Sequence, residues 1–143
     1  MSNLIYSILP KPARSIIQVH PDVTVSQCIE LMIRHNIGAL VVTDDDNLLG
    51  IVSERDVVRG LLHHGGSLLD RPVSEILWAN VVVLKPTDTV ETAMAVITET
   101  RRHHVLVAED GKLVAIVSIG DVLFSLLEDK ARVIQQLENY IHQ

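Results

Sequence analysis

The chain has 143 residues, of which 48% are hydrophobic but only 3% aromatic, so a folded core must be built mainly from Val, Ile, Leu and Ala. A formal net charge of −6 argues against a nucleic-acid partner, because nucleic-acid binders neutralise many phosphates with Lys and Arg. With Cys28 as its single cysteine and no apolar run near 18 residues, the sequence indicates neither a disulfide framework nor a membrane partner, and we expect a cytoplasmic protein.

An internal repeat organises the sequence. A shift of 65 places lays residues 15–62 on residues 80–127 without a gap, and 13 of the 48 aligned positions are identical. Such a register is rarely preserved by chance, so we expect two copies of one structural unit.

The two copies show the same signals in chain order. Each opens with a β-branched run that predicts a strand, at 16–19 and 81–84, and a proline halts it. Thr24 and Thr89 then offer N-cap hydroxyls to helices with apolar residues at helical spacing. Two more strands flank an acidic turn in each copy and predict a hairpin. These strands are expected at 39–42 with 48–52 and at 105–107 with 113–117.

A second helix is expected to follow each hairpin. Ser53 and Ser118 stand where the last strand ends, and an aspartate three residues later predicts an N-terminal cap. Between the copies, residues 63–67 are expected to form a flexible loop and residues 73–77 a short helix. From Leu127 onward the chain predicts an amphipathic helix whose apolar stripe needs a partner surface.

These elements predict an α+β fold of tandem βαββα repeats. One repeat alone would leave a face of its sheet exposed to water, so two copies are expected to cover each other within a single module spanning 1–143. The expected divisions are repeat 1 at 10–63, a linker at 64–79, repeat 2 at 80–128 and a C-terminal helix at 129–143.

Three sequence stretches, together with the repeat, carry a resemblance to a known family. They are Gly-Ile-Val-Ser-Glu-Arg-Asp at 50–56, Ile-Val-Ser-Ile-Gly-Asp at 116–121 and Gln-Leu-Glu-Asn-Tyr-Ile at 136–141. From about residue 5 to its end the chain resembles the stand-alone cystathionine-β-synthase (CBS) domain pair proteins of bacteria and organelles. The resemblance implies repeats packed through their sheets with pseudo-twofold symmetry, two clefts for AMP, ATP, NAD(H) or S-adenosyl compounds, and a homodimer.

The resemblance also implies the residues of a ligand site. Asp56 or Asp121 would accept hydrogen bonds from ribose hydroxyls, and Ser53 or Ser118 would face the phosphate, with Arg55 near the first cleft. Each cleft is expected to combine the helix start of one copy with strands of the other. The Asp56 cleft would then include Val81, Val82, Arg102, His103 and His104. The Asp121 cleft would include Ile16, Ile17, Ile37, Gly38 and Ala39.

General chemistry favours the same assignment. An ionised carboxylate can accept two charge-assisted hydrogen bonds from a vicinal diol, and a helix N-terminus favours a phosphate. Short β-branched strands beside Gly38 can supply an apolar slot for adenine. Because Arg55 and residues 101–104 would surround Asp56, we expect the Asp56 cleft to bind a phosphate-bearing ligand more tightly.

Each of these sequence features also has an interpretation that involves no ligand. Asp56 and Asp121 are also typical helix caps, and residues 101–104 are also typical of a solvated helix end. His63 and His64 lack further metal ligands, so no metal is assigned. Cys28 falls on an apolar helix face, as a small hydrophobe does. The acidic run at 44–47 lacks calcium-loop spacing and is interpreted as a turn.

The leading hypothesis is a regulatory adenine-nucleotide sensor with no obligatory cofactor, which passes ligand occupancy to a partner protein or through its homodimer. The alternative is a ligand-free structural scaffold. An enzyme is not predicted, because no nucleophile with its base, metal cluster or P-loop is present in the sequence. The family's usual proline is Val41 or Leu106 here, a usual glycine is Ala115, and a frequent arginine is His103, so ligand identity stays open.

Overall fold

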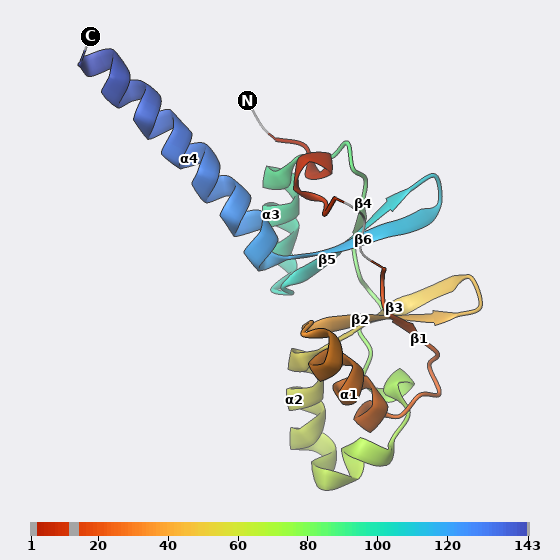
Figure 1. Ribbon diagram of the computed structural model, residues 1–143. Coiled ribbons are helices and arrows are strands. Elements are labelled where there is room, and N and C mark those ends of the chain that lie inside the picture. The colour runs from red at the N-terminus through yellow and green to blue at the C-terminus, as the bar shows by residue number, and fades with distance from the viewer. Residues whose placement is uncertain (1–2, 12–14, 143) are drawn as a thin grey trace. The chain divides into compact units, whose positions relative to one another are not determined.

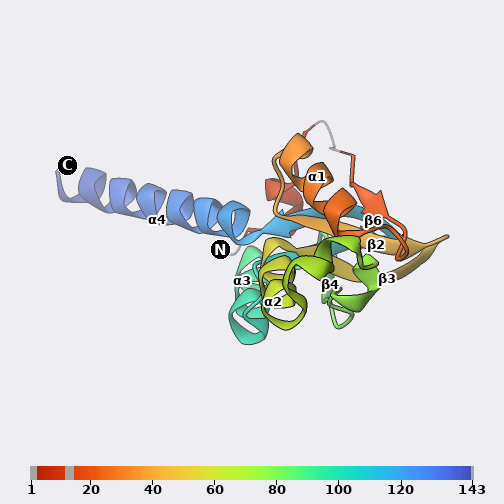
Figure 2. The same ribbon diagram turned by 90° about the horizontal axis from the view of Figure 1, so that it is seen from below.

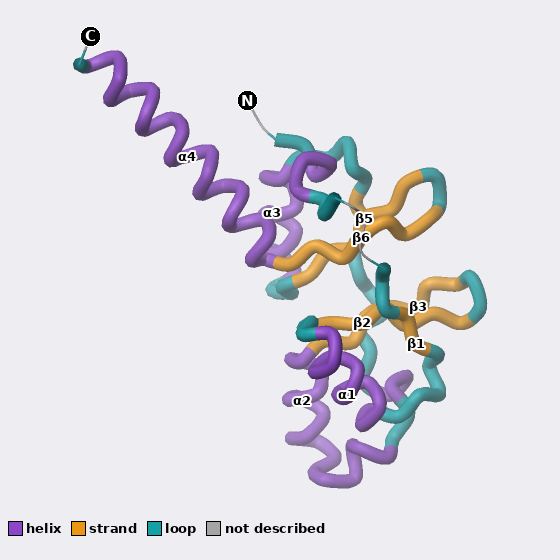
Figure 3. The backbone as a smooth tube through the Cα atoms, viewed as in Figure 1, coloured by secondary structure: helices purple, strands orange, loops and turns teal. Residues whose placement is uncertain are grey.

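The computed structural model describes residues 3–11 and 15–142 (Figure 1). The described chain divides into two compact units: the first unit is residues 15–81, and the second unit is residues 82–142 together with residues 3–11. Each unit contains one copy of the repeat, and each copy forms a three-stranded sheet with helices packed against it (Figure 3).

The first unit has the predicted order of elements. It contains β1 (Gln18–Val19), α1 (Val25–His35), β2 (Ala39–Asp44), β3 (Asn47–Ser53) and α2 (Glu54–His64), followed by the 3₁₀ turns η2 (Gly65–Asp70) and η3 (Val73–Glu75). In the sheet, β1 runs parallel to β2, and β2 runs antiparallel to β3. The interior of the sheet, including Leu40, Val42 and Val52, packs on Cys28 and Met32 of α1.

The second unit repeats this arrangement. It contains η1 (Ile5–Ile8), β4 (Val83–Leu84), α3 (Val90–Thr100), β5 (His104–Glu109), β6 (Lys112–Ser118) and α4 (Ile119–Ile141). The sheet order β4-β5-β6 and its parallel and antiparallel pairs match those of the first unit. Val105, Val107 and Val117 pack on Ala93 and Ile97 of α3. The βαββα order predicted for each repeat is therefore confirmed.

Local chemistry explains where these elements begin and turn. Thr24 Oγ1 accepts a hydrogen bond from the Gln27 backbone N–H at 3.2 Å, so the predicted helix cap is confirmed. The hairpin turns contain two residues rather than the expected four, and Asp45 and Asp110 take positive φ angles of 53° and 52° there. Aspartate tolerates this left-handed conformation better than most residues, so the acidic runs suit tight turns.

The first strands are shorter than predicted. Only two residues in each copy form regular strand, and Ile17 and Val82 lie just before it. Pairing nevertheless reaches one residue further, because the Val41 N–H donates to the Ile17 carbonyl at 3.1 Å and the Leu106 N–H donates to the Val82 carbonyl at 3.2 Å.

The flexible loop predicted at 63–67 is wrong. His63 and His64 complete the last turn of α2, and residues 65–70 form the 3₁₀ turn η2. The cause is Leu68, which is fully buried against Val25 of α1 and Val57 of α2. A single apolar anchor in a glycine-containing segment thus fixes a stretch whose composition is typical of a loop.

The N-terminal segment belongs to the second unit, which the sequence analysis did not predict. The Ile5 N–H donates to the Asp88 carbonyl at 2.8 Å, and the Val90 N–H donates to the Asn3 carbonyl at 2.8 Å. Ile5 is fully buried in the core of that unit. Residues ahead of the first copy of the repeat therefore stabilise the second copy.

The stretch ahead of the second copy behaves in the same way toward the first. The Val25 N–H donates to the Arg71 carbonyl at 2.9 Å, and the Val73 N–H donates to the Val23 carbonyl at 2.8 Å. Val73 is fully buried in the core of the first unit. The segment ahead of the first repeat thus packs at the start of α3 in the second unit. The segment ahead of the second repeat packs at the start of α1 in the first unit.

Truncation of Ile5 tests this docking. We expect Ile5→Ala to lower the free energy of unfolding by about 2–5 kcal/mol, as for other large-to-small core changes. The neighbouring Tyr6 is 57% exposed, so Tyr6→Ala is a matched control with an expected loss below about 1 kcal/mol. Urea denaturation measures both, and equal losses would contradict the docking of this segment.

Helix α4 extends well past the sheet and α3 of its own unit (Figure 2). Every residue from 130 to 142 is exposed. Among the residues that the structure describes, no helix combines the length and the apolar character needed to cross a bilayer.

Candidate functional site

The start of α2 holds a serine and an aspartate in a capping box. Ser53 is the N-cap, and Asp56 Oδ2 accepts hydrogen bonds from both the Ser53 backbone N–H and the Ser53 hydroxyl, each at 2.9 Å. The N-cap has extended backbone, which turns its N–H toward the carboxylate. The cap predicted from the three-residue spacing is confirmed.

The start of α4 has the same arrangement. Asp121 Oδ2 accepts hydrogen bonds from the Ser118 N–H at 2.9 Å and from its hydroxyl at 3.0 Å. The Asp121 N–H donates to Ser118 Oγ at 3.3 Å, which completes the box. Each repeat therefore places a carboxylate, a hydroxyl and the first N–H groups of a helix within a few ångströms of one another.

The two capping boxes differ in burial. Ser53 is 7% exposed and Asp56 is 5% exposed, whereas Asp121 is exposed and Ser118 is half-buried. Hydrogen bonds to a carboxylate strengthen as water is excluded, and an unpaired partner becomes more costly. The Asp56 box is therefore the stronger contributor to stability, and the Asp121 box is the more accessible to a ligand.

Each unit brings the start of its own second strand against its own helix start. In the first unit, Ala39 pairs with Ser53 across the hairpin, and the Glu54 N–H donates to the Gly38 carbonyl at 3.1 Å. This contact ties the polypeptide just before β2 to the first turn of α2. The predicted site residues Gly38, Ala39 and Ser53 are thus neighbours.

The second unit repeats this contact with different side chains. His104 pairs with Ser118, and the Ile119 N–H donates to the His103 carbonyl at 2.8 Å. Because residues 102–104 replace Ile37, Gly38 and Ala39, the basic residues stand beside the Asp121 box of their own unit.

The predicted site residues fall in three places in each repeat. Before β1 and β4 lie Ile16, Ile17, Val81 and Val82, all half-buried; at the starts of β2 and β5 lie Ile37, Gly38, Ala39, Arg102, His103 and His104; at the starts of α2 and α4 lie Ser53, Arg55, Asp56, Ser118 and Asp121. Backbone hydrogen bonds within each unit join the stretch before β2 or β5 to the start of α2 or α4, and join Ile17 to β2 and Val82 to β5. The pairing of each acid with the strands of the opposite copy stays a prediction.

The basic residues 101–104 begin with a left-handed residue at the end of α3. Arg101 ends α3 in the left-handed conformation with φ of 57°, and the Arg102 N–H donates to Thr100 Oγ1 at 3.3 Å. This tight exit from the helix turns residues 102–104 directly into β5. Asn36, the equivalent residue of the first copy, has φ of 52° at the end of α1.

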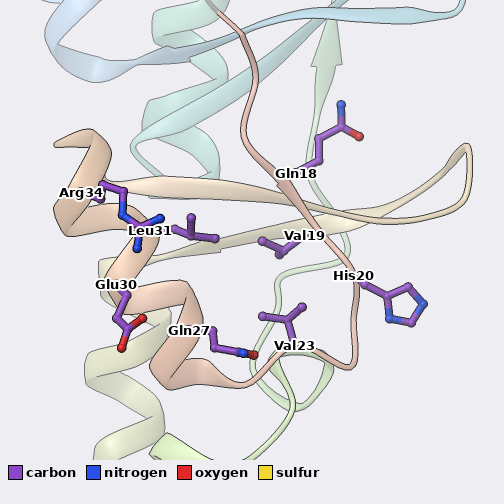
Figure 4. Close-up of a pocket in the computed structure, with 8 residues that line it drawn as sticks. All are labelled: Gln18, Val19, His20, Val23, Gln27, Glu30, Leu31 and Arg34. Atoms are coloured by element: carbon purple, nitrogen blue, oxygen red, sulfur yellow. The ribbon is translucent and has the colours of Figure 1, made fainter.

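A separate pocket of about 370 Å³ lies between α1 and the segment around β1 (Figure 4). His20 stands at its edge, where its Nδ1 accepts a hydrogen bond from the Asp22 N–H at 3.1 Å and its Nε2 lies 3.4 Å from Asp44 Oδ1. The pocket is lined by Gln18, Val19, His20, Val23, Gln27, Glu30, Leu31 and Arg34. Sequence reasoning missed it, because these residues come from two elements and form no motif.

Side chains that hold metals are not gathered in the described part of the chain, residues 3–11 and 15–142, where no group of three or more His, Cys, Asp or Glu is placed for an ion. Cys28 is fully buried in the core of the first unit. Burial raises the pKa of its thiol to about 11, so the reactive thiolate is scarce at neutral pH.

Comparison with known proteins gives a consistent result. The sequence model of the CBS domain family matches residues 6–63 and again residues 73–128. The mitochondrial CBS domain-containing protein CBSX3 of Arabidopsis thaliana is 33% identical over 125 residues, which cover 84% of this chain and 61% of the relative. An Acidianus ambivalens protein is 33% identical and covered to 66%. The chain thus spans less than two thirds of these curated relatives.

Solved structures show the same likeness. The CBS-domain protein ATU1752 of Agrobacterium tumefaciens is 36% identical, with a TM-score of 0.82 and coverage of 86% of this chain and 98% of that one. CBSX2 in complex with AMP has a TM-score of 0.68, with 23% identity over 90% of this chain and 98% of its own. The CBS pair of MJ0100, with 5′-methylthioadenosine and S-adenosyl-L-methionine, has a TM-score of 0.75, with 23% identity and coverage of 91% and 99%. At 23% identity the last two show the fold.

Proposed function

Because the chain belongs to the CBS domain family, with one match on each repeat, we propose that it is a regulatory module that binds an adenine nucleotide at the helix starts of its repeats. The observation that carries the proposal is the pair of capping boxes, each of which sets a carboxylate beside a hydroxyl at the start of a helix. The carboxylate suits a ribose diol and the helix start suits a phosphate.

The adenosine-containing ligands of two structural neighbours support this class of ligand. The structure of CBSX2 is a complex with AMP, and that of the MJ0100 CBS pair is a complex with 5′-methylthioadenosine and S-adenosyl-L-methionine. For this chain we propose AMP, ATP or NAD(H), with Asp56 or Asp121 on the ribose and Ser53 or Ser118 facing the phosphate. No obligatory cofactor and no chemical step are assigned.

Two arrangements of the ligand are compatible with these residues. In the first, which the family resemblance implies, the helix start of one repeat works with strands of the other, so that Asp56 shares its ligand with residues 102–104. In the second, each repeat uses its own strand start. The contact between Ile119 and His103 supports the second, because it sets His103 and His104 beside Asp121.

Regulation requires that the ligand bind one state of the protein better than another. We propose that the ligand-bound state is recognised by a partner protein, or transmitted through a homodimer, in the cytoplasm. The second candidate function is a ligand-free scaffold, and the exposed apolar face of α4 favours it. We propose that the module is divided into repeat 1 at 10–63, a linker at 64–79, repeat 2 at 80–128 and a C-terminal helix at 129–143.

Thermal unfolding in the presence of nucleotides separates the two functions. A ligand at 100 times its dissociation constant adds about 2.7 kcal/mol to the free energy of unfolding. For a chain of this size that raises the midpoint by about 5–10 °C. We expect such a shift with at least one of AMP, ATP, NAD, NADH and S-adenosylmethionine, and none with inorganic phosphate at equal concentration. A flat response to all five would support the scaffold.

A further inference from the structure

The pocket between α1 and β1 shares no residue with the proposed nucleotide site. Its volume of about 370 Å³ lies near the lower end of the roughly 300–1,000 Å³ range of small-molecule pockets, so it suits a metabolite smaller than a nucleotide. The floor is apolar, because Val19 is 7% exposed and Val23 and Leu31 are half-buried. In Figure 4, Leu31 from α1 and Val19 from β1 point toward each other. An aliphatic group is therefore the favoured occupant of the floor.

The helix side of the pocket carries one cation and one anion. Arg34 and Glu30 are both exposed and lie one turn apart on α1 (Figure 4). Neither forms an ion pair or a side-chain hydrogen bond with another residue that the structure describes, so both charges are available to a ligand. Gln27 adds a donor, because its Oε1 accepts a hydrogen bond from the Thr24 N–H at 3.0 Å and its amide N–H groups remain for a ligand.

The other polar side chains around the pocket are already engaged. The two ring nitrogens of His20 face the Asp22 N–H and the Asp44 carboxylate. Gln18 Oε1 accepts a hydrogen bond from the Thr43 hydroxyl at 3.2 Å, and the Gln18 side chain points away from the pocket in Figure 4. The polar groups left for a ligand are therefore those of the helix side.

We propose that this pocket binds an α-amino acid with a branched aliphatic side chain, such as leucine. The carboxylate of the amino acid meets the Arg34 guanidinium, whose paired N–H groups match its two oxygens, and the ammonium meets Glu30. The aliphatic side chain covers the apolar floor. A nucleotide fits less well, because the Glu30 carboxylate repels its phosphates.

The second repeat shows that the fold does not require these two charges. At the equivalent positions, 65 residues later, Ala95 replaces Glu30 and Glu99 replaces Arg34. Helices α1 and α3 nevertheless have the same length of 11 residues. The pair of opposite charges therefore belongs to the pocket of the first unit rather than to the repeat, which supports a role in binding.

Nuclear magnetic resonance titration of the isotope-labelled, full-length protein with L-leucine tests the site. We expect a dissociation constant of about 1 mM or lower, with the largest shifts at the amides of β1 and α1. The probe 4-methylpentanoate lacks the ammonium, 3-methylbutylamine lacks the carboxylate, and glycine lacks the aliphatic side chain. Each should bind at least ~10-fold more weakly than leucine, since each loses one of the three contacts.

Two variants and a matched control assign the charges. Glu30→Gln and Arg34→Gln each change an exposed side chain, so the fold should persist, and each should weaken leucine binding at least ~10-fold. Glu99→Gln, at the position of the second repeat equivalent to Arg34, should bind leucine as the wild type does.

Three results would overturn the proposal. They are the absence of shifts at about 20 mM leucine, equal binding of leucine and 4-methylpentanoate, and binding by either pocket variant as tight as that of the Glu99→Gln control. Because the pocket contains no residue of the proposed nucleotide site, these results stand apart from those of the nucleotide screen.

Discussion

Replacing Gly50 with alanine is expected to lower the free energy of unfolding by about 2–4 kcal/mol, a large loss for the addition of one methyl group. Gly50 has a φ of +157°, and an added Cβ would lie 2.2 Å from the carbonyl oxygen of Trp78. That oxygen is fixed, because it accepts a hydrogen bond from the Ile51 N–H at 3.0 Å while the Trp78 N–H donates back to Ile51 at 2.8 Å. Neither backbone can move aside without breaking this bridge.

The second repeat supplies the control for this change. Ala115 occupies the position equivalent to Gly50, and its backbone is not left-handed. In the described part of the chain no isolated bridge forms at Ile116, the counterpart of Ile51. We therefore expect Ala115→Gly to cost only about 0.5–1 kcal/mol, through lost backbone stiffness. Guanidinium unfolding of both variants makes the comparison, and similar losses would show that the bridge at Trp78 is not the cause.

The contact with Trp78 gives a physical reason for the glycine in the first copy. The family pattern has a glycine at the start of the third strand, and the second copy lacks it. The structure shows that the glycine is required where the chain leaving η3 lies against β3, as Trp78 does at Ile51.

The repeated order of strands and helices could be predicted because its signals are local. Hydroxyl caps, strand runs and acidic turns each occupy a few consecutive residues, and each recurs 65 residues later. The docking of residues 3–8 could not be predicted in this way. Leu4-Ile5-Tyr6-Ser7 and Pro72-Val73-Ser74-Glu75 take equivalent places without one identical residue, because backbone hydrogen bonds hold them.

The contacts of the candidate site likewise fall into those that the sequence predicts and those that it does not. The contact of Asp56 with Ser53, and of Asp121 with Ser118, follows from a spacing of three residues at a helix start and was predicted. The adjacency of His104 to Ser118 follows from the register of a hairpin, which depends on a two-residue turn and a bulge after Val107. The assignment of His104 to the opposite acid rests on the family resemblance and stays a prediction.

We expect Asp56→Asn to weaken binding of a phosphate-bearing adenine nucleotide by about 10–100-fold, the range for removing hydrogen bonds to a charged group. Asparagine keeps the size of the side chain and an acceptor oxygen for the Ser53 N–H, but loses the charge that a ribose diol would use. In the arrangement that joins Asp56 to Arg55 and residues 102–104, the Asp56 site binds more tightly than the Asp121 site. Asp121→Asn is then expected to change the tighter dissociation constant less than threefold.

Isothermal titration of AMP into the two variants decides between the arrangements, since each variant replaces the aspartate of one of the two equivalent capping boxes. Because Asp56 is 5% exposed, its variant is titrated at least 15 °C below its own midpoint of unfolding, so that a loss of stability is not taken for a loss of binding. If Asp121→Asn abolishes binding and Asp56→Asn leaves it intact, the ligand lies within the second repeat. His103 and His104, which the hairpin sets beside Ser118, would then be the side chains nearest the phosphate.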